Sequence, residues 1–301
     1  MNGVLVLDKP AGFTSFDAVA VMRGLAHEKK IGHTGTLDPM ATGVLPLLLG
    51  CATRACALLP DTEKEYEAAF RLGYATDTQD ATGKKTAESG RGATRAQVES
   101  ALAAFRGEIW QVPPMVSAVS VGGKRLYELA RRGIEVERRP RRVTVGRLDL
   151  LSYDETDRSG TLRIACSKGT YVRTLCADLG EALHTYGVMT ALRRTRACGF
   201  TLSDSMTLPQ AKTLAAKGRL AERLLPVETL FSGFPTVAVS PAQTVRFLNG
   251  GALDLERTAL RREPEPVQGT FRVKGPEDEF LGLGRVESGQ LCVLRLFRRG
   301  E

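Results

Sequence analysis

Two periodicities of apolar residues succeed each other along the chain. Short apolar or alternating runs, typical of buried and half-buried strands, cover residues 3–9, 64–73, 143–152 and 161–167. Runs with apolar residues three and four positions apart, typical of helices, cover residues 94–105, 125–132 and 170–184. Strands and helices are therefore mixed along the chain without strict alternation, since two helices and then two strands follow one another, which predicts an α+β main domain.

One more helix is predicted to open at Thr14, which is suited to be its N-cap with Asp17 three residues further on. Its apolar face would include Phe16 and Val19. Residues 31–50 follow and contain four glycines, so we expect no long regular element there.

The last part of the chain differs in character. Beyond a connector at 225–235, short strand-like runs are separated by Gly and Pro, and ten basic residues are balanced by nine acidic ones. This pattern predicts a small β-rich module of about 65 residues. We place the domains at residues 1–230 and 231–301.

No segment suits a membrane or a secretion signal. The longest apolar run, Val44–Leu49, is interrupted by Pro46 and is far shorter than the roughly 20 residues that a membrane span needs. The N-terminus has no basic region followed by an apolar stretch. We therefore expect a soluble cytoplasmic protein.

The cysteines and histidines point to no metal or redox cofactor. None of the six cysteines forms a C-x-x-C pair, and the three histidines do not have zinc-ligand spacing from them. Small buried hydrophobic side chains are the simpler interpretation of the cysteines. Any chemistry is then expected to come from ordinary side chains.

Positive charge is concentrated in two stretches. Residues 121–142 hold eight basic and three acidic residues, and residues 161–196 hold six basic and two acidic ones, within a chain of net charge +8. Solvated surface faces are one interpretation of such runs. Clustered guanidinium groups instead favour a polyanion, because Arg pairs with phosphate through two parallel hydrogen bonds, and we predict a nucleic-acid partner.

Two charged residues break local rules. Asp38 lies in a glycine-rich segment and precedes Pro39, so its backbone is biased toward an extended conformation that can present the acid in a cleft. Arg173 falls in the first turn of a predicted helix, where the helix dipole disfavours a cation. A carboxylate partner would remove that conflict and hold the acid ionised, and phosphate binding is the competing interpretation. Tyr66 and Tyr171 occupy strand-like contexts in which core packing is the simpler role.

The segment GHTGTLDPMATGVLPLLLG (Gly32–Gly50) and five further segments, in the same order, resemble the bacterial tRNA pseudouridine-55 synthases of the TruB type. The five are LVLDKPAGFTS (Leu5–Ser15), KEYEAAFRLGYATDTQDATG (Lys64–Gly83), PPMVSAVSVGGKRLYELARRG (Pro113–Gly133), CSKGTYVRTLCADLG (Cys166–Gly180) and LRRTR (Leu192–Arg196). The tail, with FLNGG (Phe247–Gly251), resembles the PUA RNA-binding module of that family.

The resemblance implies a fold and a set of partners. The fold is a mixed, largely antiparallel pseudouridine-synthase sheet with flanking helices, followed by a small PUA-like β-barrel. An insertion at about 113–142 would clamp RNA. The implied partner is tRNA, with no cofactor, no obligate protein partner and a monomeric chain.

The resemblance also implies roles for single residues. Asp38 falls on the catalytic aspartate, Arg173 on the arginine that ion-pairs with it, and Tyr66 on the tyrosine that stacks on the target base and is proposed to act as a base. The positions at the substrate site are His33, Tyr171 and Leu192, with Lys9 beneath them. The basic residues expected on the RNA backbone are Lys124, Arg125, Arg139, Arg141 and Arg142. The chain departs from the family at Ser120, where lysine is usual.

The implied reaction isomerises a uridine in the tRNA T-loop, at conventional position 55, to pseudouridine, with Asp38 as nucleophile on a flipped-out base. Attack at C6 and elimination at C1′ are both compatible with these residues. Two other functions remain open: an RNA-binding or RNA-folding protein without catalysis, and a guide-RNA-dependent synthase of the dyskerin type, which shares the signature around Asp38.

Overall fold

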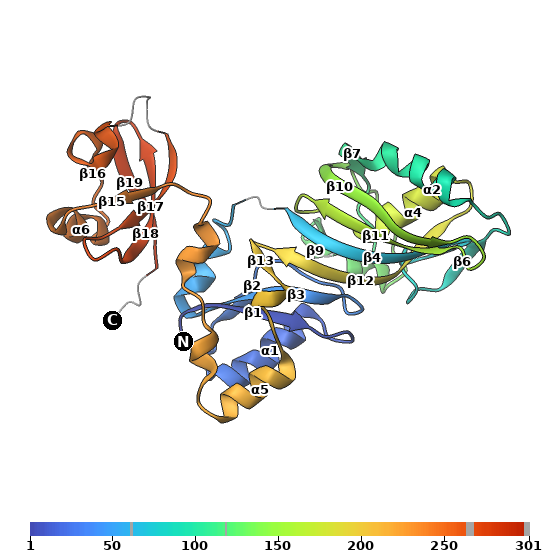
Figure 1. Ribbon diagram of the computed structural model, residues 1–301, viewed down its shortest axis with the longest axis horizontal. Helices are drawn as coiled ribbons and strands as arrows, with labels where there is room; N and C mark the ends of the chain where they lie inside the picture. The colour runs from blue at the N-terminus through green and yellow to red at the C-terminus, as the bar shows by residue number, and fades with distance from the viewer. Residues whose placement is uncertain (61–62, 118, 263–267, 298–301) are drawn as a thin grey trace.

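The computed structural model describes residues 1–60, 63–117, 119–262 and 268–297. Two sheets organise these residues, a ten-stranded mixed sheet and, at the other end of the molecule, a five-stranded sheet (Figure 1). The predicted α+β fold with a mixed, largely antiparallel sheet is confirmed, because only the β1–β14 and β12–β3 pairs of the large sheet are parallel.

The large sheet has the strand order β14-β1-β3-β12-β4-β11-β10-β7. In that order the strands are Met206–Thr207, Gly3–Lys9, Thr42–Leu49, Gly187–Ala197, Lys64–Leu72, Ser159–Cys166, Arg141–Asp154 and Gly107–Gln111. Two short strands extend it, β2 (Ile31–His33) on β3 and β13 (Phe200–Thr201) on β12. Two hairpins lie outside it: β5 (Tyr74–Thr76) with β6 (Lys85–Glu88), and β8 (Ser120–Val121) with β9 (Lys124–Arg125).

The helices pack mainly against the large sheet. The α-helices are α1 (Ser15–Ala26), α2 (Arg95–Leu102), α3 (Leu126–Ala130), α4 (Val172–Ala182), α5 (Leu208–Ala216) and α6 (Pro241–Leu248). The 3-10 helices are η1 (Gly50–Ala55), η2 (Ala103–Phe105), η3 (Leu202–Asp204), η4 (Leu220–Arg223), η5 (Val227–Phe231), η6 (Leu255–Arg257) and η7 (Ala259–Arg262). Side chains of α1, α2, α4 and α5 share one core cluster with the strands. None of the described helices is long and apolar enough to cross a membrane.

Helix α1 begins at the predicted position, but the face that it buries differs from the predicted one. Thr14 and Asp17 form a complete capping box. Val19 is buried as predicted, but Phe16 is 71% exposed, so that prediction was wrong. The buried face follows Ser15, Ala18, Val19, Met22 and Ala26, and Phe16 lies about 100° around the helix from Ser15.

Strand β3 corrects a second prediction, because residues 42–49 form a regular strand despite the glycines around them. Gly43 has φ +104° and lies opposite Arg194 in the parallel β3–β12 pair. A Cβ at Gly43 would overlap the carbonyl oxygen of Arg194 and lie 2.8 Å from its nitrogen. This glycine therefore permits close approach of two strands and does not end one.

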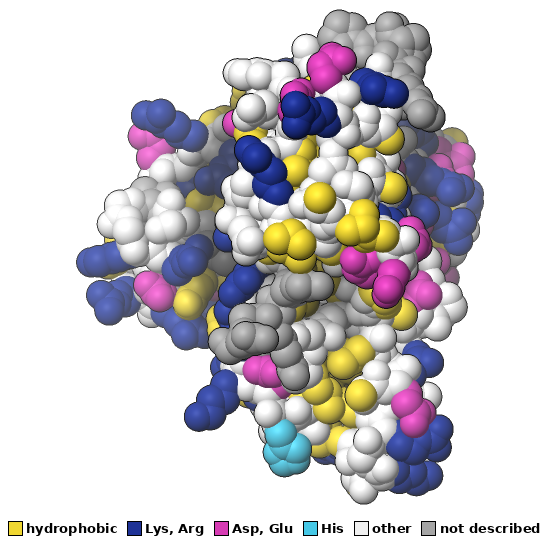
Figure 2. Space-filling view, turned by 90° about the vertical axis from the view of Figure 1, so that its left-hand side faces the viewer, with side chains coloured by type: hydrophobic (Ala, Val, Ile, Leu, Met, Phe, Trp, Pro, Cys, Tyr) yellow, Lys and Arg dark blue, Asp and Glu magenta, His cyan; other side chains and the backbone are white. Residues whose placement is uncertain are grey.

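The five-stranded sheet has the order β15-β17-β18-β19-β16. Its strands in that order are Thr236–Ala238, Gly269–Lys274, Phe280–Glu287, Gln290–Leu296 and Leu253–Asp254. Figure 2 views the molecule from this side, where basic and acidic side chains are interspersed with small apolar areas. That mixture agrees with the balanced charge of the tail.

An aromatic cluster joins this smaller body to the large sheet. The Phe231 ring lies 5.6 Å from that of Phe297 and 6.0 Å from that of Phe234. The same cluster includes Val4 and Val44, from strands β1 and β3. Phe231 belongs to η5, so the domain boundary predicted at 230/231, which stays a prediction, falls at the junction itself.

Gly43→Ala is expected to lower the free energy of unfolding by about 2 kcal/mol or more, because it combines a positive φ with a backbone clash. Gly24→Ala is the matched control, since Gly24 lies within α1 and a methyl group added there would meet nothing within 4 Å. The control should gain up to about 1 kcal/mol. Urea unfolding measures both, and equal stabilities for the two variants would contradict the close-approach role.

Candidate active site

Asp38 and Arg173 form an ion pair between a loop and a helix. Asp38 lies in the loop between β2 and β3, and Arg173 in the first turn of α4. The Nε of Arg173 is 3.1 Å from Oδ2 of Asp38, and its Nη2 is 3.3 Å from Oδ1. Arg173 is therefore paired with a carboxylate, which is one of the two interpretations that its sequence position left open.

A second acid, Asp80, binds the same guanidinium. Arg173 Nη1 lies 3.2 Å from Oδ2 of Asp80, and Oδ1 of Asp80 accepts hydrogen bonds from the hydroxyl of Thr78 (2.9 Å) and the amide of Thr82 (3.0 Å). Arg173 also donates to the carbonyls of Thr78 (3.1 Å) and Val116 (2.8 Å). Arg173 is thus held rigidly between two carboxylates. Sequence reasoning missed Asp80, for which the polar turn around it was the available signal.

Burial and neighbouring charges shift the pKa of Asp38 in opposite directions. Burial raises its pKa above the ordinary aspartate value, the Arg173 guanidinium lowers the pKa, and the neighbouring Asp80 carboxylate raises it. The side chain of Asp38 remains 35% exposed, whereas that of Arg173 is 5% exposed. The acid can therefore be reached from outside while its partner cannot.

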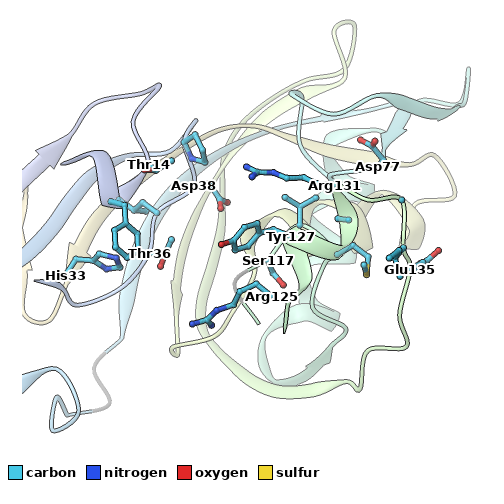
Figure 3. Close-up of a pocket in the computed structure, with 18 residues that line it drawn as sticks. Thr14, His33, Thr36, Asp38, Asp77, Ser117, Arg125, Tyr127, Arg131 and Glu135 are labelled. Carbon is cyan, nitrogen blue, oxygen red and sulfur yellow. The ribbon is translucent and has the colours of Figure 1, made fainter. Parts of the chain in front are cut away.

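A cavity of about 1190 Å³ opens in front of Asp38. Residues of the segment predicted to clamp RNA form one wall of this cavity. Figure 3 shows Tyr127 of α3 projecting toward Asp38, with Arg125 and Arg131 nearby. His33, on β2, lines the opposite side. A cavity of this size can hold a nucleotide together with part of its neighbours.

Phe16 and Tyr127 are site residues that sequence reasoning missed. The exposed ring of Phe16 lines the cavity and packs edge-on against His33, with ring centroids 5.9 Å apart. Burial lowers the pKa of His33, which favours its neutral form. The exposed aromatic residue on α1 thus supports the imidazole at the mouth of the site.

Three other predicted site residues are not among those that line this cavity. Tyr66, on β4, is 8% exposed, and Leu192, on β12, is also 8% exposed. Tyr171 is the N-cap of α4, and its backbone exchanges two hydrogen bonds with Gln111 (3.0 and 3.3 Å). Burial raises the pKa of Tyr66, and the nearby Arg194 lowers it.

Lys9, at the end of β1, is fully buried. Its ammonium donates to the carbonyls of Pro10 (2.8 Å), Phe13 (2.7 Å) and Pro39 (3.4 Å). Burial lowers the pKa of Lys9 to about 8. Since Pro39 follows Asp38, the hydrogen bond from Lys9 to Pro39 connects the loop that carries Asp38 to strand β1.

The basic residues predicted on the RNA backbone are spread along one region. Lys124 and Arg125 form β9, where Ser120 donates to the carbonyl of Lys124 (3.3 Å), and only Arg125 of the five lines the cavity. Arg139, Arg141 and Arg142 are exposed, and Arg142 is ion-paired with Glu108. Within the described ranges no group of three metal-ligating side chains suits a metal ion.

Family profiles match most of the chain. The profile described as "TruB family pseudouridylate synthase (N terminal domain)" matches residues 23–172. "tRNA pseudouridylate synthase B C-terminal domain" matches 173–232, and "Pseudouridine synthase II TruB, C-terminal" matches 235–297. Together with the fold and the site, these matches define a pseudouridylate synthase, which is an isomerase. The chain belongs to the TruB family.

Curated relatives are similar over almost the whole length. A protein of Azoarcus sp. named "tRNA pseudouridine synthase B" is 45% identical over 298 residues, covering 98% of this chain and 95% of its own. One of Dechloromonas aromatica with the same name is 45% identical over 294 residues, covering 97% and 93%.

Solved structures share the fold. The "Crystal Structure of a Cbf5-Nop10-Gar1 Complex" contains a chain 26% identical to this one, with a TM-score of 0.74, covering 98% of this chain and 85% of that chain. The "Structure of H/ACA RNP bound to a substrate RNA containing 2'-deoxyuridine" matches with a TM-score of 0.74 at 23% identity, covering 99% and 85%. These likenesses agree with the mixed sheet and the small C-terminal PUA-like module.

The two neighbours of Asp38 are expected to move its pKa in opposite directions. Asp80→Asn removes a negative charge and should lower the pKa of Asp38, whereas Arg173→Gln removes the positive partner and should raise it. Carboxyl ¹³C chemical shifts followed against pH measure both changes. If the titration midpoint of the Asp38 carboxyl moved in the same direction in both variants, the opposite effects assigned to Asp80 and Arg173 would be contradicted.

Proposed function

We propose that this pseudouridylate synthase acts on tRNA and isomerises the uridine at position 55 of the T-loop, with Asp38 as nucleophile. One observation carries the proposal. Asp38 faces a nucleotide-sized cavity while its counter-ion Arg173 is buried behind it. The name "tRNA pseudouridine synthase B" of relatives 45% identical supports tRNA as the substrate.

The chemistry requires an ionised carboxylate. The bond between N1 and C1′ breaks, the detached ring rotates, C5 bonds to C1′, and a proton leaves C5. Asp38 can serve this sequence by attacking C6 or by stabilising charge at the sugar during elimination at C1′, and both roles need the anion. Burial alone would neutralise Asp38, so the guanidinium of Arg173 keeps a fraction of it charged.

The target base has to leave the folded loop before it can reach Asp38. Flipping a nucleotide costs a few kcal/mol. We infer that Tyr66 stacks on the extruded ring, which is worth about 1–3 kcal/mol, while His33 fills the vacated space in the RNA with Phe16 behind it. Tyr171 and Leu192 then bound the base, and Lys9 supports the loop below.

The basic segment closes over the bound RNA. Arg125 and Arg131 line the cavity opposite Asp38, and Lys124, Arg139 and Arg141 continue the positive surface outward. Contacts to phosphates would hold the loop and exclude water, which protects a sugar-bound intermediate from hydrolysis. We also propose that residues 231–301 form a second RNA-binding unit and that the chain acts alone, as a monomer.

Tritium release separates this function from its alternatives. The purified protein alone, with unmodified tRNA carrying [5-³H]uridine, should release tritium, because C5 exchanges its hydrogen for the bond to the sugar. An RNA-binding protein without catalysis would release none. A guide-dependent enzyme would release tritium only after a guide RNA was added.

Asp38→Asn is expected to abolish isomerisation while tRNA binding stays within a few-fold, because the amide keeps the shape and loses the charge. Single-turnover product mapping and filter binding measure the two quantities. A variant that binds tRNA poorly yet converts bound tRNA at the normal rate would contradict the nucleophile role.

Replacing Arg139, Arg141 and Arg142 together by Ala should make the slope of log K for tRNA binding against log salt concentration less steep. The expected change in that slope is about 0.7–0.9 for each phosphate that is no longer neutralised. Because Arg142 is paired with Glu108, we expect the change to correspond to fewer than three phosphates. Arg71, Arg95 and Arg219, which are exposed elsewhere, provide a matched triple-Ala control. An unchanged slope in the first triple variant would refute the clamp.

A further inference from the structure

Arg194, on β12, is a fully buried arginine with 0% exposure. Its Nε donates to the carbonyl of Val44 (2.7 Å), its Nη2 to that of Gly35 (3.1 Å) and its Nη1 to that of Thr36 (3.5 Å). Among the described residues no carboxylate is ion-paired with it. Burying a charge without a counter-ion is costly, so this guanidinium needs an explanation beyond packing.

The groups that Arg194 touches belong to two parts of the proposed catalytic site. Gly35 and Thr36 lie in the loop that presents Asp38 two residues later. On the other side, Arg194 lies directly opposite Tyr66 in the antiparallel β12–β4 pair, so the two side chains extend from the same face of the sheet. One buried side chain thus adjoins both the loop of the acid and the tyrosine.

The backbone is arranged to permit this contact. Gly43 allows β3 to lie against the backbone of Arg194, as described above. The neighbouring residues of β12 have different roles: Arg193 is paired with Asp8 and Arg196 with Glu65, both near the surface. Arg194 alone of these three is directed into the interior.

We propose that Arg194 is a positioning residue for the isomerisation, which holds the loop of Asp38 and the side chain of Tyr66 in register so that the Tyr66 oxygen accepts the C5 proton. This inference rests on the proposed function. In that step the C5–H bond breaks and its electron pair becomes part of the C5=C6 double bond. N1 takes up a proton, and the C5 proton passes to the Tyr66 oxygen and then to water.

The charges around Tyr66 agree with this role. The groups that face it are Arg194 from β12, Cys166 from β11 and Asp38 from its loop. Arg194 lowers the pKa of Tyr66, whereas burial, Cys166 and Asp38 raise it. Burial is the largest of these effects and keeps the pKa of Tyr66 above the ordinary tyrosine value, and Arg194 limits that rise.

An isotope effect separates positioning from simple structural support. Arg194→Lys should lower kcat on the order of 10²-fold while KM stays within about threefold, because proton transfer is impaired and binding is not. A primary isotope effect should appear with [5-²H]uridine tRNA as proton removal becomes rate-limiting. Arg196→Gln, on the same strand, should leave rate and isotope effect unchanged. Unchanged kcat, or a slow variant without an isotope effect, would overturn the proposal.

A second measurement needs no turnover. Fluorotyrosine placed at position 66 ionises at a lower pH, and its ¹⁹F signal reports that ionisation. Arg194→Gln should move the midpoint upward, and Arg194→Lys should move it less. An unchanged midpoint in a folded Arg194→Gln variant would overturn the role of the charge. Absence of pseudouridine from the products of the unaltered enzyme would contradict the proposed function instead.

Discussion

The buried guanidinium of Arg173 is the interaction on which the site depends. It lies between the carboxylates of Asp38 and Asp80 and also donates to two carbonyls, one of which belongs to Val116 in the segment 113–142 that walls the cavity. Removing such a charge from water is costly unless its hydrogen bonds are complete. The first turn of α4 therefore fixes the acid and anchors the segment proposed to hold RNA at the same point.

The surrounding fold supports this pair with further buried cations. Lys9 and Arg194 are fully buried and bind the backbone on either side of the Asp38 loop, at Pro39 and at Gly35. Arg173 and Lys9 both lower the pKa of Asp38, whereas burial and the Asp80 carboxylate raise it. These two cations therefore oppose the neutralisation that burial would otherwise impose on Asp38.

Local patterns predicted most of the scaffold because strand and helix periods, and the cap at Thr14, are encoded within a few residues. They also marked Arg173 as needing an anionic partner, either a carboxylate or a phosphate, since a cation at a helix N-terminus is disfavoured, and the structure supplies carboxylates. Strand β3 was missed because the close approach that explains Gly43 is made to a strand 150 residues away in sequence. Asp80, Phe16 and Arg194 were missed for a related reason: their roles depend on tertiary contacts that no local pattern records.

The central claim is that Asp38 acts directly on the flipped uridine, and a crystal structure of the Asp38→Asn protein with a tRNA T-arm stem-loop tests it most directly. The account predicts an extruded uridine whose C1′ or C6 lies about 3–3.5 Å from the residue 38 side chain, with Arg173 still in contact. A target uridine that remains stacked in the RNA loop, or that binds away from residue 38, would contradict it.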